Sequence, residues 1–412
     1  MSEPLLPPGL PLPLSIQGSG MRFEVLGIPN VSERIDETPM SGMSGEGSVR
    51  MYTLLKVLYQ NPSSSIYMCN WHSALRPKEG APPLIEIARF GENTRLIALK
   101  ILEYPTLSAS SLPKTKELDA LRTFPPHRNV ITLYDYFFSL EQRKLYLAIG
   151  AMEGNLYQLM KTRKGKVLAG GLVSSILHQT LLGLNHIHSN GYFHRDLIPE
   201  NILITTQGLF DYPAVPGTTT TTTAADALEE KDVVVIAKVS DFGLARELDS
   251  EGPYTEYVTV RWYRSPEVLL QSRQYTSAID MWAFGAIAAE LLNLSPLFPG
   301  SSTLDQCIKI CEVLGNPSDE ARSDENGYPM DGGAWPTGIE LARSIGFQFP
   351  SVAPRPFSSF FEAGTSRSLL GCIKGLLQYD PHNRLTSQTC LTHEYFSETS
   401  THREVPAHLQ KY

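Results

Sequence analysis

Cysteine is scarce in this sequence. The 412 residues include five cysteines, which are odd in number and scattered: Cys69, Cys307, Cys311, Cys372 and Cys390. Secreted disulfide scaffolds are dense in paired cysteines, so this pattern excludes that class and indicates reduced thiols in the cytoplasm or nucleus. Cys307 and Cys311 could share a helix face as metal ligands. Because no histidine or carboxylate pair is spaced to complete a zinc site, we interpret them as small core residues.

The sequence also has fewer basic than acidic residues, and it has few long apolar runs. The chain has 35 lysines and arginines against 43 aspartates and glutamates, a net charge of −8. This balance argues against binding to nucleic acid or to an anionic membrane. The most apolar stretch, 278–294, contains Asp280 and Glu290 and is too short to cross a bilayer. The first 13 residues contain five prolines and form no leader-like segment. We therefore expect neither a nucleic-acid nor a membrane partner.

What the chain does contain is enough apolar sequence for a large core. Hydrophobic residues make up 42% of it, and at roughly 150 residues per domain the length predicts two or three domains, or one two-lobed unit with tails. Residues 1–49 are rich in proline and then in serine and glycine, which predicts a disordered extension. Short apolar runs between turn residues then predict strands at 52–58, 66–71, 95–102, 130–138 and 144–149. One helix is predicted at 114–122.

The pattern changes from period two to helical spacing after Gly154. Apolar residues recur every three or four positions from Val173 to Ile187, and further helices are predicted at 278–293, 302–314 and 366–379. The prediction is an α+β fold with a small β-rich lobe at 50–150 and a larger helical lobe at 154–398. A cleft between such lobes is a common ligand site. A tail at 399–412 completes the chain.

One insertion interrupts the second lobe. Residues 201–204 and 233–239 have the composition of paired strands, yet the tract between them, about 206–232, contains six consecutive threonines. A connection of this length without structure of its own is either functional or disordered.

Three short motifs follow one another in the second lobe. They are His194-Arg195-Asp196 with Asn201 five residues later, Asp241-Phe242-Gly243, and Ser265-Pro266-Glu267; Ala98-Leu99-Lys100 precedes them on a predicted strand. Any one of them could arise by chance in a turn or at a helix cap. In this order they resemble the signature of the eukaryotic protein kinases, over residues 50–398. The two-lobed kinase fold is what the resemblance implies.

The resemblance implies a role for each polar residue in these motifs. Asp196 would accept the proton of a substrate hydroxyl, while Asn201 and Asp241 would bind Mg²⁺ through hard oxygen ligands. Lys100 would contact the α- and β-phosphates of ATP, held by Glu117 from the predicted helix at 114–122. Taken alone, Lys100 or Glu117 would be interpreted as an exposed surface charge.

The same resemblance places the nucleotide. Its adenine would contact the backbone of the hinge at 150–152 behind the gatekeeper Ile149. The residues implied around ATP are Leu58, Ile66, Ala98, Lys100, Ile149, Gly150, Met152 and Leu203. Ordinary core packing explains the apolar members of this set nearly as well.

Further segments indicate a subgroup. Thr255-Glu256-Tyr257 resembles the dual phosphorylation site of mitogen-activated and related kinases, which implies an upstream activating kinase and a phosphate bound by Arg195. A plain surface loop is the alternative. The stretch 152–160 resembles the male germ cell-associated and intestinal cell kinases, whose subgroup includes the fungal meiosis-inducing kinases. Protein substrates and a monomer are expected.

The resemblance also implies two internal contacts. Glu267 would pair with Arg384 near the end of the domain, and Asp280 would brace the loop that contains Asp196. The histidines around this loop, His188 and His194 among them, have no cysteine or acidic neighbour in sequence and are interpreted as structural.

Three departures from the kinase pattern bear on activity. The segment 58–67 contains no glycine where the family has a glycine-rich phosphate loop, and Pro62 there has no N–H to offer. Ile198 stands where serine/threonine kinases have lysine, and Val260 where they have threonine. Two functions stay open: a serine/threonine kinase of reduced activity, or a pseudokinase scaffold that binds partners or nucleotide. The retained Lys100, Asp196, Asn201 and Asp241 favour the enzyme.

Overall fold

The structure is a computed structural model, and its description covers part of the chain. The described residues are 13–14, 25–31, 48–75, 77–84, 86–87, 94–103, 115–139, 142–206, 235–247, 260–317, 332–352 and 355–402. They form two compact units, each described by itself below. Of the described residues, unit 1 comprises those up to 127 together with 131–152, and unit 2 comprises 128–130 and those from 153 onward. The threonine tract and the predicted phosphorylation sites Thr255 and Tyr257 lie outside the described residues.

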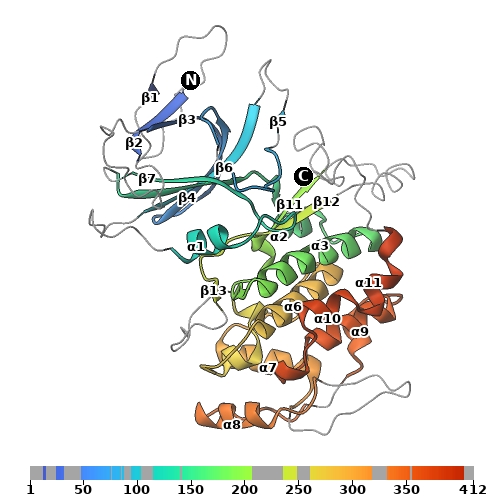
Figure 1. Cartoon of the computed structure of the whole chain (residues 1–412). Coiled ribbons are helices and arrows are strands. Elements are labelled where there is room, and N and C mark those ends of the chain that lie inside the picture. Colours follow the sequence, from blue (N-terminus) through green and yellow to red (C-terminus); the bar gives the residue numbers. More distant parts are fainter. Residues whose placement is uncertain are drawn as a thin grey trace, which may run out of the picture. The chain divides into compact units, whose positions relative to one another are not determined.

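Unit 1 is built on an antiparallel sheet with one helix (Figure 1). The strand order is β1-β2-β3-β4-β6-β8-β7, with β5 paired to β6. Its elements are β1 (Pro13–Leu14), β2 (Val25–Val31), β3 (Ser48–Gln60), β4 (Ser64–Trp71), β5 (Glu86–Ile87), β6 (Thr94–Glu103), α1 (Lys116–Thr123), β7 (Leu133–Ser139) and β8 (Lys144–Gly150). The predicted helix and the five predicted strands are all present. Aromatic rings fill the core, where Tyr52 stacks on Trp71 and Phe137 on Tyr146.

Two expectations for this unit need correction. Residues 1–49 are not wholly without structure, because β1, β2 and the start of β3 lie within them. The strand β2 pairs with the edge of β3, and its register shifts between Ile28 and Val31, where Pro29 has no N–H to donate. The predicted strand at 130–138 begins only at Leu133. Val130 belongs to unit 2, where it forms a bridge with Val239.

Unit 2 is mainly helical. Its helices are α2 (Leu156–Thr162), α3 (Gly170–Ser189), α5 (Pro266–Leu269), α6 (Ala278–Asn293), α7 (Thr303–Leu314), α8 (Pro336–Ser344), α9 (Arg367–Leu376), α10 (Ser387–Leu391) and α11 (Glu394–Glu398). Its short strands are β9 (Gly154–Asn155), β10 (Tyr192–Phe193), β11 (Ile202–Thr206), β12 (Val235–Val239) and β13 (Arg246–Glu247). The predicted pairing of the strands flanking the threonine tract is confirmed, because β11 pairs with β12 from Ile202 opposite Val239 to Thr206 opposite Val235.

The apolar helix of the sequence is the central helix of unit 2. On α6 every residue from Ile279 to Leu291 is buried, which explains why its sequence has no polar face. The long helix α3 contacts both α6 and α10 (Figure 1). Within the described residues, no helix has the length and apolar character needed to cross a membrane. All five cysteines are buried free thiols, and Cys307 and Cys311 contribute to the core.

Candidate functional site

The predicted lysine–glutamate pair is present in unit 1. Lys100 lies on β6 between buried neighbours, and Glu117 is on the first turn of α1. The Lys100 ammonium contacts both carboxylate oxygens of Glu117, at 2.7 and 2.8 Å, and both side chains are buried. An ion pair this far out of water needs close geometry to offset desolvation, and the two short contacts supply it. The interpretation of either residue as an isolated surface charge is therefore wrong.

Most of the predicted nucleotide residues lie on adjacent strands of this sheet. Ala98 on β6 is opposite Ile149 on β8, and Ile66 on β4 is opposite Lys100. Ala98, Ile149 and Met152 are buried, whereas Leu58 and Ile66 are half-buried. Strand register thus brings the predicted contacts of unit 1 together. Leu203, the remaining apolar residue of the set, lies on β11 in unit 2.

The turn between β3 and β4 replaces the expected glycine-rich loop. The side-chain oxygen of Asn61 accepts hydrogen bonds from the backbone N–H groups of Ser63 (2.9 Å) and Ser64 (2.7 Å). The Asn61 amide donates in turn to the hydroxyl of Tyr59 at 2.8 Å. The backbone donors that a phosphate would need at this turn are therefore already occupied by a side chain of the turn itself. Proline at 62 could not contribute another.

The His194-Arg195-Asp196 motif of unit 2 is held by a side chain of α6. The carboxylate of Asp280 is fully buried and accepts from the backbone N–H groups of His194 (2.7 Å) and Arg195 (2.8 Å). His188 contacts the same carboxylate at 2.9 Å. Arg195 has a φ of +71°, a left-handed conformation that non-glycine residues adopt only under constraint. The predicted brace by Asp280 is confirmed, and the histidines of this region have the structural contacts expected of them.

Asn201 connects the two halves of the predicted metal site. Its amide nitrogen donates to the backbone oxygen of Asp196 at 2.8 Å, and its own backbone oxygen accepts from Ser240 N–H at 2.9 Å. Asp241 follows Ser240 directly and has a φ of +63°. Hydrogen bonding thus places the predicted base, Asp196, and the two predicted metal ligands at one end of the β11–β12 hairpin.

The donor chemistry of this hairpin end suits magnesium. Because the Asn201 amide nitrogen donates to Asp196, its side-chain oxygen would be the group available to a cation, and the Asp241 carboxylate would be the second hard oxygen ligand. Among the described residues no cluster of three or more histidine, cysteine, aspartate or glutamate side chains could hold a metal alone. A magnesium ion is usually held by one or two protein ligands, with water and substrate phosphates completing its coordination, so Asn201 and Asp241 would suffice to bind one.

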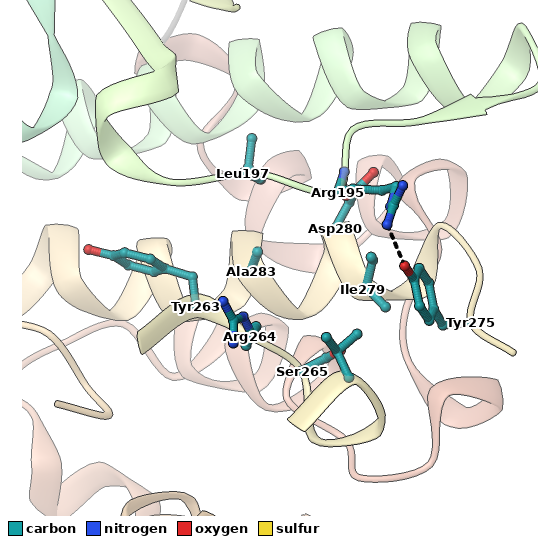
Figure 2. Close-up of a pocket in the computed structure, with 10 residues that line it drawn as sticks. Arg195, Leu197, Tyr263, Arg264, Ser265, Tyr275, Ile279, Asp280 and Ala283 are labelled. Carbon is teal, nitrogen blue, oxygen red and sulfur yellow. Dashed lines mark hydrogen bonds between the residues drawn. The ribbon is translucent and has the colours of Figure 1, made fainter. Parts of the chain in front are cut away.

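Arg195 makes contacts that its motif did not reveal. Its guanidinium donates to the Tyr275 hydroxyl at 2.6 Å and lies over the same ring (Figure 2). Both residues line a cavity of about 30 Å³ between α6 and the loop that contains Asp196. Arg264 lines it as well. Tyr275 lies 80 positions further along the chain, so no local pattern marked it. The cavity has room for about one water molecule.

The two apolar departures have different surroundings. Ile198 is half-buried and precedes the single helical turn at Pro199–Asn201, while Val260 is 42% exposed before the turn at Arg261–Tyr263. An apolar side chain this exposed gains little from burial, so packing does not explain valine at position 260.

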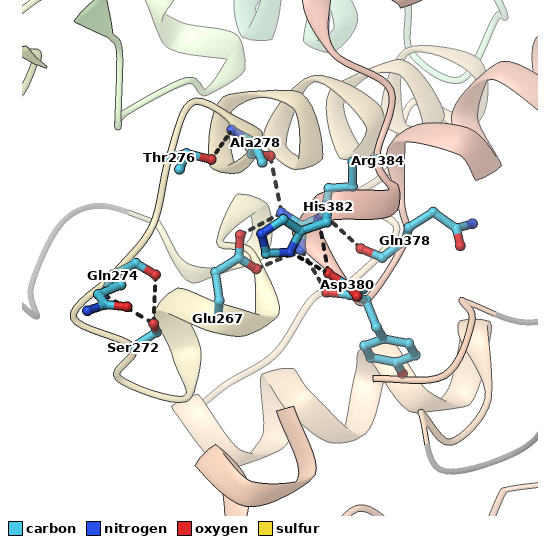
Figure 3. Close-up of polar contacts among 10 residues, drawn as sticks. Glu267, Ser272, Gln274, Thr276, Ala278, Gln378, Asp380, His382 and Arg384 are labelled. Atoms are coloured by element: carbon cyan, nitrogen blue, oxygen red, sulfur yellow. Dashed lines mark hydrogen bonds and ion pairs between the residues drawn. The ribbon is translucent and has the colours of Figure 1, made fainter. Parts of the chain in front are cut away.

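The predicted pair at the end of the domain is present. Arg384 binds Glu267 through two 2.6 Å contacts, with both side chains almost completely buried (Figure 3). The guanidinium also donates to the backbone oxygens of Gln378, Ala278 and Tyr379. All of its donors are used, which is what makes a buried charge tolerable.

Comparison with known proteins identifies the family of this chain. Residues 85–396 match the protein kinase domain model, and the chain belongs to that family. It is 35% identical over 307 residues to the meiosis induction protein kinase IME2/SME1 of Saccharomyces cerevisiae (74% of this chain, 46% of that protein). It is 36% identical over 339 residues to human serine/threonine-protein kinase MAK (81% and 47%) and 37% identical over 306 residues to rice cyclin-dependent kinase F-3 (74% and 60%).

These relatives confirm the predicted family and subgroup. The chain spans about half the length of the curated relatives that it matches. The match to the protein kinase domain model begins at residue 85. It therefore excludes β3 and β4, whose connecting turn lacks the family's glycines.

Proposed function

We propose that the protein is a serine/threonine kinase that transfers the γ-phosphate of ATP to hydroxyl groups of protein substrates. The observation that carries the proposal is the buried Lys100–Glu117 pair, because kinases need this pair assembled for phosphoryl transfer. The arrangement of Asp196, Asn201 and Asp241 supports the same function. Serine/threonine kinases among the relatives, such as human MAK, favour this substrate class.

In the proposed mechanism each residue positions a group or holds a charge. Lys100, held in place by Glu117, binds the α- and β-phosphates, and Asp196 accepts a hydrogen bond from the substrate hydroxyl and orients it. Asn201 and Asp241 would hold magnesium, which neutralises phosphate charge when bound. Asp280 keeps the backbone of the catalytic loop in the conformation that presents Asp196.

The activity is proposed to be low. Asn61 occupies the backbone donors of the β3–β4 turn, so phosphate would have to displace it, and Ile198 supplies no charge to the transferring group. The same occupied turn is the observation that favours the second candidate function, a pseudokinase scaffold. Retention of the ion pair and of both metal ligands weighs toward the enzyme.

Transfer of radiolabelled phosphate to a generic basic protein tests the proposal. The 412-residue chain is compared with its Asp241→Asn variant, which would lose a metal ligand but keeps the side-chain volume. We expect signal above that variant. Signal equal to it would reject the enzyme in favour of the scaffold.

Nucleotide binding has a separate test. Mg-ATP should raise the melting temperature of the wild type, because a ligand that binds only the native state stabilises it. The Lys100→Met, Asp241→Asn double variant should show no such rise. An equal rise in that variant would mean that the nucleotide binds elsewhere.

We further propose that an upstream kinase phosphorylates Thr255 and Tyr257 and thereby raises activity, with Arg195 receiving a phosphate. Phosphopeptide mapping, with the Thr255→Ala, Tyr257→Phe protein as control, checks this. Unmodified protein as active as modified protein would refute it. The buried free thiols support a cytoplasmic or nuclear location, and a monomer is proposed.

A further inference from the structure

The helix that holds Glu117 is short. The eight residues of α1 make two turns, and helices of this length are marginal without contacts from the rest of the protein. Its N-terminus is capped locally, since the Thr115 hydroxyl accepts from Leu118 N–H at 3.0 Å. The last backbone carbonyls of a helix have no partner within it and need one elsewhere.

A lysine from a distant loop meets that need. The ammonium of Lys78 contacts three backbone oxygens at the C-terminal end of α1: that of Phe124 at 2.8 Å, that of Leu121 at 3.4 Å and that of Arg122. A cation at this end also interacts favourably with the helix dipole. Lys78 is an exposed residue, and partial desolvation of its ammonium lowers its pKa from the ordinary value, a cost that the carbonyl contacts offset in part.

The loop presenting Lys78 is itself fastened to the core of unit 1. We name residues 72–84, between β4 and β5, the 72–84 loop. Lys78 opens a tight turn closed by Ala81 N–H donating to Lys78 O at 3.0 Å, with Gly80 at the positive φ of +79° that favours glycine. Leu75 and Leu84, on either side of the turn, pack against the aromatic core.

A further contact fixes the second half of the loop. The hydroxyl of Tyr134 on β7 donates to the backbone oxygen of Pro82 at 3.1 Å. Proline at positions 77, 82 and 83 restricts the backbone on both sides of the turn. These contacts hold the backbone around Lys78, so its ammonium is positioned next to the end of α1.

From these contacts we infer that Lys78 is a positioning residue, and that the 72–84 loop clamps the C-terminal end of α1 so that Glu117 stays on Lys100. The inference deepens the proposed kinase function and rests on it for its catalytic consequence. The clamp itself is a property of unit 1 alone. By holding α1, the clamp keeps Glu117 in contact with Lys100.

Hydrogen–deuterium exchange of the full chain tests the clamp without reference to activity. Lys78→Met should accelerate exchange of the amides at the end of α1, 121–124, by about 2- to 30-fold, the range expected for losing a cation from a helix C-terminus. Lys78→Arg, which keeps the charge and the donors, should restore most of the protection. Lys56→Met, the same change at an exposed lysine of β3, should leave α1 unaffected. Exchange in Lys78→Met as slow as in the wild type would overturn the inference.

A double-mutant cycle then tests whether Lys78 acts through Glu117. Lys78→Met should lower kcat for phosphate transfer by about 3- to 30-fold in the wild-type background but less than twofold in the Glu117→Gln background, because the pair is already broken there. Equal losses in both backgrounds would show a general structural effect and overturn the catalytic role. If the wild type transfers no phosphate at all, the proposed function fails, and exchange alone decides on the clamp. Should Lys78→Met not fold, Lys78→Gln, which retains a donor, replaces it in both measurements.

Discussion

Replacement of Asp280 by asparagine should be among the most damaging single substitutions in unit 2. The fully buried carboxylate accepts from two backbone N–H groups and from His188. An asparagine has one acceptor oxygen, and its amide hydrogens would face donors. Burying donors without partners and breaking a buried charged network typically costs about 3–5 kcal/mol, so we expect a loss of unfolding free energy of that size.

The loop that contains Asp196 should also lose its conformation. Arg195 is held at a φ of +71° by the same carboxylate, and such a backbone conformation costs about 1–2 kcal/mol for a non-glycine residue. Once the brace is removed, the loop should relax toward an ordinary conformation and Asp196 should lose its position. We expect phosphate transfer to fall by at least about tenfold, since each 1.36 kcal/mol is a factor of ten in rate.

The assay is urea unfolding followed by tryptophan fluorescence, since three of the four tryptophans lie in unit 2. The matched control is Asp305→Asn, because Asp305 also accepts from a backbone N–H, that of Ser301 at 2.7 Å, but does so in water. Only a small change is expected there. Equal destabilisation by the two substitutions would refute the claim that burial of the Asp280 network sets the cost.

The pH dependence provides a second check on Asp280. Burial by itself would raise the pKa of this carboxyl, but the hydrogen bond and charge of His188, with the backbone contact from His194, lower it below its ordinary value. A carboxyl with a lowered folded-state pKa stabilises the fold above the unfolded-state pKa of about 3.9. That contribution should disappear as the pH falls through the folded-state pKa, and Asp280→Asn should lack this acid-dependent part of the loss.

Three other variants have clear expected outcomes. Burial lowers the pKa of Lys238 to about 8, so the unfolding free energy of the wild type should increase as the pH rises from 8 to 10.5. At pH 7, Lys238→Met should be more stable than the wild type by at most about 3 kcal/mol, and urea unfolding should show that the variant lacks this pH dependence. Glu267→Gln should lose about 3–5 kcal/mol in the same assay by leaving Arg384 buried without its counter-charge, and an unchanged midpoint would contradict this. Ile198→Lys with Val260→Thr should raise the phosphate-transfer rate at saturating Mg-ATP by more than the product of the single changes, up to about 10²–10³-fold, and strictly independent effects would show that the sites are not coupled.

Much of the fold could be predicted from local sequence. The helix α6 was predicted at its observed ends because its apolar run is continuous, and β11 and β12 were recognised on either side of an insertion by their β-branched residues. The motif order identified Lys100, Asp196 and Asp241 as candidates. Contacts such as Glu267–Arg384 and Lys100–Glu117 were accessible only through resemblance to the kinases, because they join residues 117 and 17 positions apart.

Other features were decided by tertiary structure. β7 begins at Leu133 and not at the predicted residue 130, because Val130 pairs with Val239 in unit 2. β2 forms within a proline-rich segment because its backbone groups pair with those of β3. In the same way, the clamp by Lys78 and the contact between Arg195 and Tyr275 have no sequence signal. Local patterns record which face of a segment is apolar and where turns are allowed. Which carbonyl or hydroxyl a charged side chain meets depends on how distant segments pack, and that information is spread over the whole chain.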